Sequence, residues 1–591
     1  MVEKGKIPVI VGVTGHRNIA AEDRGELRTQ IVAALEGIKR ACSPVGGGEN
    51  TPVIMLNAFA QGADMLCAEA AFDMGIDVFA VLPRSQDEYI KSFTDPTDRE
   101  KLFAYLGKVK RVIVAPDFEG NREWLGKEYN IGGEDYEYRQ AGIYIAEYSH
   151  ILLALWDGKE AESRFGCGTV EVIKFALNHD FLNADRVFSP GAMNDSAVLW
   201  INARRAGAEK QPVKRRWLVS KFANESGAEP YGDYRVCGEM PKYLSKIIEK
   251  TAEYNAEASS DGACRLWKRE DELDEYRRNL SDHYSKADSL SFDGNQKYYN
   301  LFILLIAIIG TFVAFSFMLY DDAALTFMIL PCALAVGALI WIIRHGHSKG
   351  YHEKYIEYRA VAEAFRIQFY MSLCLSERQA LSNVCRLYSW TQKVNSAWIY
   401  KALQAVAATS DVQSPDIDAS EIIDVWIGNS EEPKGQMRYH TEKLVKNRSK
   451  AGKYNRISKA LSVITVCIYA AIFIMEAIGH ILNACGISWF WEGLILGNIL
   501  WRSVGVILMG TATAASLLFA SYFGKLCFDR KAEDNFKMGM FYSSAYARWQ
   551  EAKSRPSVEK DKFVKEIARE EIIENGIWCS YVKDNSLEIN I

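Results

Sequence analysis

Four long apolar runs distinguish the second half of the chain from the first. They extend from Tyr299 to Tyr320, from Ala323 to Ile343, from Ile457 to Ile478 and from Ser503 to Gly524. Each run is close to the roughly 20 residues that an α-helix needs to cross the hydrocarbon core of a bilayer. The pattern therefore predicts four transmembrane helices in two hairpins, at residues 298–345 and 457–524.

Charges beside these runs predict their orientation. Lysine and arginine flank the inner ends of the runs, whereas the short link between the first two runs carries Asp321 and Asp322. By the positive-inside rule, both termini and the middle segment face the cytoplasm. The N-terminal run is too short for a signal peptide, so the chain is expected to begin in the cytoplasm. A multi-pass protein of the inner (cytoplasmic) membrane is predicted.

Two features of the spans leave alternatives open. Gly510 and Ala514 lie four residues apart in the fourth span, and small residues at this spacing let helices pack closely. They fit a contact within the four-helix unit and a contact between subunits equally well. Glu476, near the end of the third span, either lines a pore or extends its carboxylate to the membrane interface.

Short apolar runs alternate with helical patterns over the first 205 residues. Strands are expected at 7–15, at the start of 52–75, and at 77–83, 110–116, 150–158 and 197–204, with helices near 22–41, 62–73, 85–106, 134–148 and 168–178. Alternating strands and helices with continuous apolar strands predict an α/β domain with a Rossmann-like, doubly wound parallel sheet. An all-α membrane domain with four transmembrane helices follows it.

The polar segments between these parts complete the predicted organisation. A charged helical connector is expected at 206–297, a cytoplasmic helical segment at 346–456 and a cytoplasmic C-terminal tail at 525–591. Twelve cysteines show no metal-ligand spacing, and a reducing compartment fits them better than a disulfide framework. The net charge of -5 gives no electrostatic case for a nucleic-acid partner.

Glycine turns and charged residues follow several of the predicted strands, at the edge where parallel α/β sheets bind ligands. Arg17 offers a planar guanidinium for phosphate, and Gly62 lets the backbone approach a ligand. Asp64 either accepts a ribose hydroxyl or caps a helix. The turn at 166–169 opens a helix, so its amides and the helix dipole face a bound anion. One such turn is more often structural, but four on one edge predict a nucleotide site.

The predicted ligand-binding residues come from these turns and from the helix near 134–148. They are Gly12, Thr14, Gly15, His16, Arg17, Gly62, Ala63, Asp64, Pro83, Arg84, Glu88, Arg139, Gly166, Cys167, Gly168, Thr169 and Glu171. The sequence contains no P-loop and no complete G-x-G-x-x-G motif, so ATP hydrolysis of the P-loop kind and ordinary dinucleotide redox chemistry are not supported. No catalytic residue and no metal site is predicted.

The same strand ends resemble the SLOG superfamily over about residues 7–205. The stretches "GVTGHRN", "QGADMLCAEAA", "VLPRSQDEY", "YRQAGIYIAEYSHILLALWDG" and "GCGTVEV" are similar to its TRPM-related prokaryotic, LOG-like branch. The membrane half is similar to SLATT-type transmembrane effector helices, in "ADSLSFDGNQ" at 287–296, "YRAVAEAFRIQF" at 358–369 and "MRYHTEKLVKNRSKAGKYNRISKAL" at 437–461.

This resemblance implies that residues 1–205 sense a nucleotide signal and are coupled to a membrane effector in a bacterial anti-phage defence system. The implied ligand is an ADP-ribose-like or cyclic nucleotide made by a separate enzyme, and no further cofactor is required. The implied effector is a homo-oligomeric ligand-gated pore, an ion channel, or a protein that disrupts the bilayer.

One departure from the enzymatic branch favours binding over cleavage. LOG enzymes carry a glutamate three residues after the threonine of their glycine motif, whereas here Val172 stands three residues after Thr169. The nearest glutamate is Glu171, and a one-residue shift on a helix rotates a side chain by about 100°. The alternative is a membrane-anchored LOG-like hydrolase of nucleotides or NAD derivatives that uses Glu171 or Asp64. A transporter has little support, because the spans lack paired polar breaks.

Overall fold

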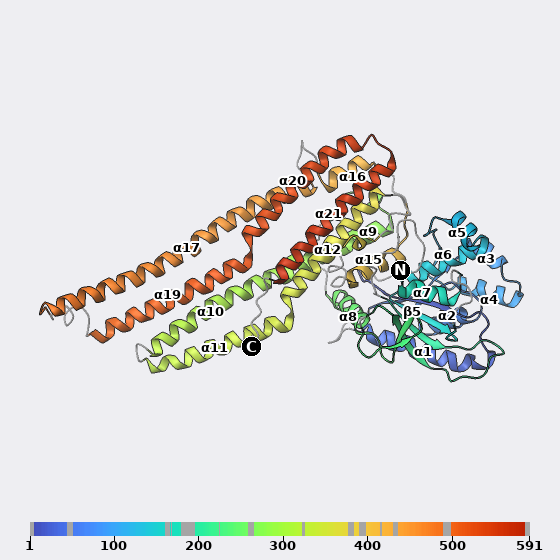
Figure 1. The fold of residues 1–591 in the computed structure, drawn as a ribbon, viewed down its shortest axis with the longest axis horizontal. Helices are drawn as coiled ribbons and strands as arrows, with labels where there is room; N and C mark the ends of the chain where they lie inside the picture. The colour runs from blue at the N-terminus through green and yellow to red at the C-terminus, as the bar shows by residue number, and fades with distance from the viewer. Residues whose placement is uncertain are drawn as a thin grey trace. The chain divides into compact units, whose positions relative to one another are not determined.

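Figure 1 shows the structure, which is a computed structural model. The chain folds into two compact units. Unit 1 comprises Met1–Asp261, Arg265–Tyr284 and Ala364–Pro415, and unit 2 comprises Gly262–Cys264, Ser285–Glu363 and Asp416–Ile591. The described residues are 5–43, 51–159, 166, 168–178, 196–223, 225–257, 265–321, 325–375, 383–388, 397–413, 417–428, 435–487 and 498–584.

Unit 1 is built on a mostly parallel sheet that has nine strands among the described residues. The strand order is β4-β3-β2-β1-β5-β6-β7-β9-β8, with parallel pairing from β4 through β6 and antiparallel pairing beyond β6. The strands are β1 Val9–Gly15, β2 Val53–Asn57, β3 Asp77–Leu82, β4 Arg111–Val114, β5 Ile151–Trp156, β6 Ala197–Asn202, β7 Arg215–Ser220, β8 Glu229–Tyr231 and β9 Tyr234–Cys237. The predicted α/β domain with a largely parallel sheet is therefore confirmed.

The parallel strands are apolar along almost their whole length because helices cover the sheet. All six residues of β5 are buried, and Val9, Val11 and Val13 of β1 join one large core cluster. The helices that contact the strands include α1 (Arg24–Ala41), α2 (Ala63–Asp73), α6 (Gly133–Tyr148) and α7 (Thr169–Asn178). On one side of β1 the strands β2, β3 and β4 follow in sequence order, and on its other side lie β5 and then β6.

Further helices of unit 1 lie between the strands or after the last strand. They are α3 (Gln86–Lys91), α4 (Pro96–Leu106), α5 (Arg122–Tyr129), α8 (Lys242–Ala256) and α15 (Ala397–Thr409), of which α15 is far from the strands in the sequence. Lys401 of α15 is 1% exposed, and its amine donates to the Ser149 carbonyl at 2.8 Å and to the Ser196 hydroxyl at 2.7 Å. These bonds join α15 to the segments that lead into β5 and β6. Residues 364–415 thus fold with the sheet, although the sequence placed them within one segment at 346–456.

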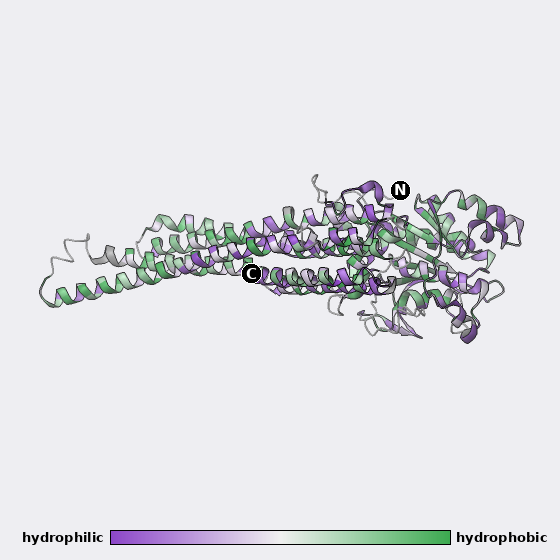
Figure 2. Ribbon diagram, turned by 90° about the horizontal axis from the view of Figure 1, so that it is seen from above, coloured by the Kyte–Doolittle hydropathy of each residue, from purple (hydrophilic) through white to green (hydrophobic). Residues whose placement is uncertain are grey.

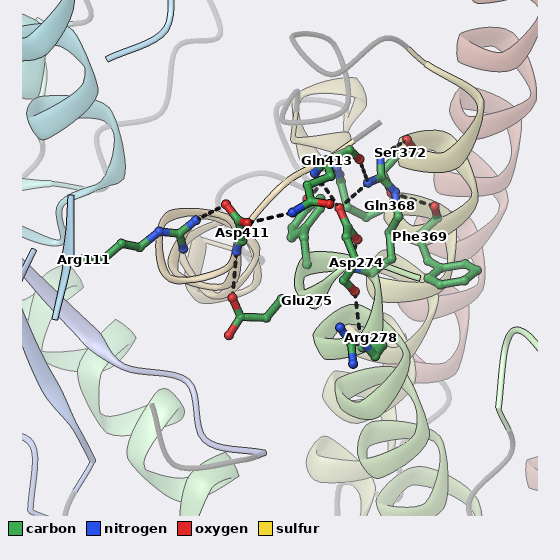
Figure 3. A network of polar contacts seen from close by, with 11 residues as sticks. Arg111, Asp274, Glu275, Arg278, Gln368, Phe369, Ser372, Asp411 and Gln413 are labelled. Carbon is green, nitrogen blue, oxygen red and sulfur yellow. Dashed lines mark hydrogen bonds and ion pairs between the residues drawn. The ribbon is translucent and has the colours of Figure 1, made fainter. Parts of the chain in front are cut away.

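A second polar network, drawn in Figure 3, joins three parts of unit 1. The Arg277 guanidinium is fully buried and donates to the carbonyls of Ser372 and Gln413, each at 2.6 Å. It also pairs with Asp274. Asp411 in turn accepts a hydrogen bond of 2.8 Å from Arg111 of β4. The network therefore links residues 265–284 and 364–415 to the edge of the sheet.

Unit 2 is helical. Its helices include α10 (Lys297–Asp321), α11 (Ile329–Lys349), α16 (Ala419–Trp426), α17 (Gly435–Ala484), α19 (Asn498–Leu526), α20 (Phe528–Ala552) and α21 (Ser557–Asp584). A π-helical segment, η3 (Leu290–Gln296), precedes α10. Among the described residues, four helices are long and apolar enough to cross a membrane. Figure 2 shows α17 changing from hydrophilic to hydrophobic along its length.

The apolar helices contact one another within the chain. A Cβ atom added at Gly510 of α19 would lie 3.0 Å from the Met318 methyl group of α10, so the glycine permits close packing there. The Thr465 hydroxyl of α17 lies 3.2 Å from the Ala512 carbonyl of α19. Gly510 of the fourth span therefore packs against α10 of its own chain.

Two further helices contain the division between the units. In α9 (Glu275–Ser289), the residues up to Tyr284 belong to unit 1 and the rest belong to unit 2. In α12 (Tyr351–Cys374), the residues up to Glu363 belong to unit 2 and the rest belong to unit 1. The chain thus passes from one unit to the other twice as helix.

Candidate functional site

The loops after β1 and β2 are held together by direct backbone contact. The Ala63 amide donates to the His16 carbonyl at 3.1 Å. Gly62 has a φ of 83°, and a Cβ atom there would collide with the Arg17 carbonyl oxygen. A Cβ atom at Gly15 would likewise collide with Ala63. Glycine is required at both positions because the two loops touch.

His16 binds across to the end of β5. Its Nε2 atom lies 3.0 Å from the Asp157 carboxylate and 3.1 Å from the Asp157 amide nitrogen. Burial lowers the pKa of His16 below its usual value, although the hydrogen bond to Asp157 opposes this. Burial alone would raise the pKa of Asp157, but the hydrogen bond with His16 and the charge of Arg205 lower it overall. His16 therefore joins the two strands at which the strand order reverses.

Asp64 is buried at the start of α2, where it organises the loop after β2. Its carboxylate accepts a hydrogen bond of 3.3 Å from the Ala60 amide, and its carbonyl accepts one of 2.8 Å from the Asn57 side chain. Burial raises the pKa of Asp64 to about 7, although the Ala60 amide and the charge of Arg17 oppose the shift. Strongly shifted carboxyl groups are enriched at functional sites, but Asp64 also has a structural role in this loop.

Two arginines converge on one tyrosine at the ends of β1 and β3. The Arg17 guanidinium lies 4.9 Å from the centre of the Tyr138 ring, and that of Arg84 lies 5.8 Å away. Arg84 is paired with Glu134 at 2.9 Å and with Glu137 at 3.1 Å. Arg17 is exposed, and within the described parts of the chain no ion pair or hydrogen bond involves its guanidinium. Arg17 thus presents a charge that has no ion-pair partner among the described residues, although it acts on the Asp64 carboxyl group at longer range.

The glycine turn before α7 is tied to α6 by a hydrogen bond from Arg139, whose guanidinium is also held in a buried ion pair. The Arg139 guanidinium donates to the Glu119 carboxylate at 2.8, 3.0 and 3.2 Å, and the two side chains are 1% and 0% exposed. The same arginine donates to the Gly166 carbonyl at 3.3 Å. Because its guanidinium is fully engaged, Arg139 holds the turn in place and is not presented to solvent.

Glu171 folds back under this turn. A Cβ atom added at Gly168 would lie 3.2 Å from its carboxylate, and one at Gly166 would lie 3.6 Å from its carboxyl carbon. The Oε1 atom is buried without a hydrogen-bond partner. Burial raises the pKa of Glu171, although its own amide, the charge of Lys174 and the Gly168 amide oppose the shift. The carboxylate thus stands close to where the sequence predicted a bound phosphate.

The remaining predicted residues have mainly local roles. A Cβ atom at Gly12 would collide with Ser149, so this glycine allows β1 to pack against the end of α6. Thr14 and Pro83 are buried, and Glu88 is exposed and accepts a hydrogen bond from Ser85 at the start of α3. Thr169 is the first residue of α7. Cys167 lies outside the described residues.

The structure brings together three of the four predicted turns. Contacts join the loops after β1, β2 and β3 through Ala63, His16 and the Tyr138 ring. The glycine turn before α7 instead contacts α6 and its own helix. The sequence argument missed Asn57, Asp157 and Tyr138. Asn57 and Asp157 stand directly at strand ends, so the sequence pattern that identified the other residues could have identified them too. The contacts of Tyr138 depend on the tertiary fold and could not be predicted in this way.

A search of the described residues finds no group of three or more histidine, cysteine, aspartate or glutamate side chains that could hold a metal ion. No family model matches this chain, and no curated protein matches it.

Proposed function

We propose that the protein is a membrane effector that binds a phosphate-bearing nucleotide at the ends of β1, β2 and β3. The observation that carries this proposal is the Arg17 guanidinium, which is exposed, rests on Tyr138 and has no acidic partner among the described residues. A guanidinium presents a rigid fork of donors that matches the geometry of phosphate. An aromatic ring beside it fixes the position of the charge.

The strand order supports this location. The reversal between β1 and β5 fits a Rossmann-like, doubly wound sheet, in which ligands bind outside the carboxyl ends of the strands at such a reversal. Gly15 and Gly62 let the loops after β1 and β2 pack directly against each other, which fixes the backbone that carries Arg17. The ligand class we propose is an ADP-ribose-like or cyclic nucleotide supplied by a separate enzyme of an anti-phage defence system.

The four apolar helices support the effector role. We propose that they span the inner membrane with both termini in the cytoplasm. Four spans are few for a pore in one subunit, so the effector is a homo-oligomer that opens a pore or disrupts the bilayer. Because α9 and α12 each continue from one unit into the other, helix movement is the proposed route of the signal. The ligand must bind the active state more tightly than the resting state.

Mass spectrometry of small molecules retained by the purified full-length protein tests this proposal. We expect a nucleotide, and we expect Arg17→Ala to weaken its binding by about 10- to 100-fold, as for loss of a charged hydrogen bond. Arg28→Ala is the matched control, because Arg28 is an exposed arginine of α1 paired with Asp73. Gly168→Asp tests the glycine turn separately. Unchanged affinity in both the Arg17 and Gly168 variants rejects this binding surface.

A second candidate, a membrane-anchored nucleotide hydrolase, is favoured by one observation. Glu171 keeps a buried carboxylate oxygen without a partner next to the glycine turn, and burial raises the pKa of this carboxyl group. A carboxyl group with a raised pKa is suited to general acid–base chemistry. Incubation with ADP-ribose and nucleoside monophosphates discriminates the two. Turnover that Glu171→Gln abolishes favours the hydrolase, whereas ligand retention without turnover favours the effector.

A further inference from the structure

Four lysines gather in unit 2 at one end of the apolar helices. Lys443, Lys446 and Lys450 lie on α17 ahead of its apolar stretch, and Lys531 lies in the first turn of α20. We call these residues the lysine cluster. Across the described ranges, no ion pair or side-chain hydrogen bond involves any of their four amines. This differs from Lys537 on the same α20 helix, which pairs with Glu533 at 2.6 Å.

Shared aromatic rings bring these amines close together. The Lys450 and Lys531 amines lie 5.0 and 5.5 Å from the centre of the same Phe528 ring. The Lys443 amine lies 5.4 Å from the centre of the Phe292 ring in η3. The charge of Lys531 interacts unfavourably with those of Lys450 and Lys443, and the charge of Lys443 with that of Lys446. The cluster thus holds like charges at short range.

Neighbouring acids do not neutralise this charge. Arg359, whose guanidinium also lies over Phe292, pairs with Asp288 at 2.8 Å and with Glu363. One arginine therefore engages two carboxylates.

Acids closer to Lys531 are engaged as well. Arg530 pairs with Asp534 at 3.2 Å, and Asp529 accepts a hydrogen bond of 3.2 Å from Asn455. Asn455 is neutral, so Asp529 keeps its charge, and the groups named here set four lysines and Arg359 against the carboxylates of Asp288, Glu363 and Asp529. Positive charge therefore remains in excess. Like charges held together in this way destabilise the folded protein unless an anion binds among them.

We infer that the lysine cluster binds the headgroup of a phospholipid that carries a net negative charge. The cluster directly precedes the apolar stretch of α17 and directly follows α19, which is where headgroup phosphates lie if these helices cross a bilayer. Phe528 and Phe292 supply apolar surface beside the amines, which suits the boundary between headgroups and acyl chains. The inference rests on the membrane location in the proposed function, but it is independent of nucleotide binding.

Native mass spectrometry of the full-length protein tests this inference. The protein is inserted into nanodiscs of phosphatidylcholine with a minor fraction of phosphatidylglycerol and then released, and the retained lipids are counted. We expect preferential retention of phosphatidylglycerol. The double variant Lys450→Ala, Lys531→Ala should reduce this preference by about 30-fold, since each lysine near an anionic surface contributes about fivefold.

Two controls make the result specific. The charge-preserving double variant Lys450→Arg, Lys531→Arg should keep the preference, and Lys537→Ala, which removes a paired lysine of the same helix, should leave it unchanged. A thermal unfolding curve for each variant shows whether the fold is retained. Because the alanine substitutions relieve repulsion, we expect no loss of stability.

Three outcomes overturn the inference. Equal retention of both lipids shows that the cluster does not select anionic headgroups. An unchanged preference in the alanine double variant places any selectivity elsewhere. Displacement of phosphatidylglycerol by inorganic phosphate alone shows that the ligand is a soluble anion. Failure of the protein to insert into the bilayer overturns the membrane location as well, which distinguishes failure of the proposed function from failure of the lipid site.

Discussion

The loop after β1 and the glycine turn before α7 place charged groups in opposite ways. In the loop after β1, Arg17 points its guanidinium over Tyr138 and no acid neutralises it among the described residues. In the glycine turn, Arg139 is buried against Glu119, and the Glu171 carboxylate lies under the turn. The first loop thus carries a positive charge without an ion-pair partner in the described structure, whereas the second contains a negative one of its own.

This difference teaches that a glycine turn at a helix start is not by itself an anion site. The exposed amides that attract a phosphate also attract a carboxylate from the first turn of the same helix. The two loops therefore require separate tests, in which stability and ligand binding are measured independently.

The largest expected effect is on stability, at the glycine turn. Arg139→Ala leaves the Glu119 carboxylate buried without its partner, and removal of one member of a buried pair costs about 3–5 kcal/mol. Thermal unfolding of the full-length protein should show a clear decrease in melting temperature. Arg122→Ala is the control, because this exposed arginine pairs with Glu137 at the surface and should cost at most about 1 kcal/mol. Equal melting temperatures for the Arg139 variant and the native protein would show that the pair does not hold the turn.

The second-largest expected effect is on the pH dependence of stability, through Asp64 and the loop after β2. The folded pKa of Asp64 is about 7 and its ordinary value is 3.8, so between these values the folded protein binds a proton that the unfolded chain releases. Stability therefore decreases as the pH rises from about 4 towards 7. Asp64→Asn should remove this pH dependence of stability. At pH 8 the free energy of unfolding of the variant should exceed that of the native protein by at most ~4 kcal/mol.

Unfolding midpoints of the native protein and the Asp64→Asn variant across this pH range provide the measurement. Asp87→Asn is the control, because Asp87 is exposed on α3. Parallel pH profiles for the native protein and the Asp64 variant would contradict the assigned pKa.

The smallest effect tests whether Glu171 competes with a ligand. Glu171→Gln removes a negative charge from the start of α7, where a single charge contributes about 0.3–1 kcal/mol. Binding of ADP-ribose, measured by isothermal titration, should become about two- to fivefold tighter. Glu249→Gln is the control, since Glu249 is exposed on α8, which follows the last strand of the sheet. Weaker binding in the Glu171 variant would mean that the carboxylate contacts the ligand favourably.

Much of the sheet was predictable because its strands are apolar on both faces. The expected strand at 77–83 corresponds to β3 at Asp77–Leu82, and the expected strand at 197–204 corresponds to β6 at Ala197–Asn202. Strands β7 to β9 were not predicted, and they lie within 206–297, so the expectation of a helical connector was wrong for that part of the segment. They are short or begin with charged residues, as in Arg215 and Arg216 of β7, so the apolar pattern is weak there.

The association of residues 364–415 with the sheet was not predictable from local pattern. It depends on Lys401 reaching Ser149 and Ser196, and on Arg277 reaching Ser372 and Gln413, across long sequence separations. The sequence placed Arg17 in the loop after the first strand and Asp64 at the start of the following helix, and the structure has both there. The sequence did not predict that Arg139 is engaged by Glu119, because a buried pair and a ligand-binding arginine look the same in one sequence.

The last strand of the sheet limits how the protein assembles. β8 has only three residues, and they begin with Glu229 and Pro230. Proline cannot donate a backbone hydrogen bond, and a strand this short offers little template for a neighbouring chain. Polymerisation by edge-to-edge strand addition is therefore blocked on that side, so copies that meet there must associate through side-chain surfaces.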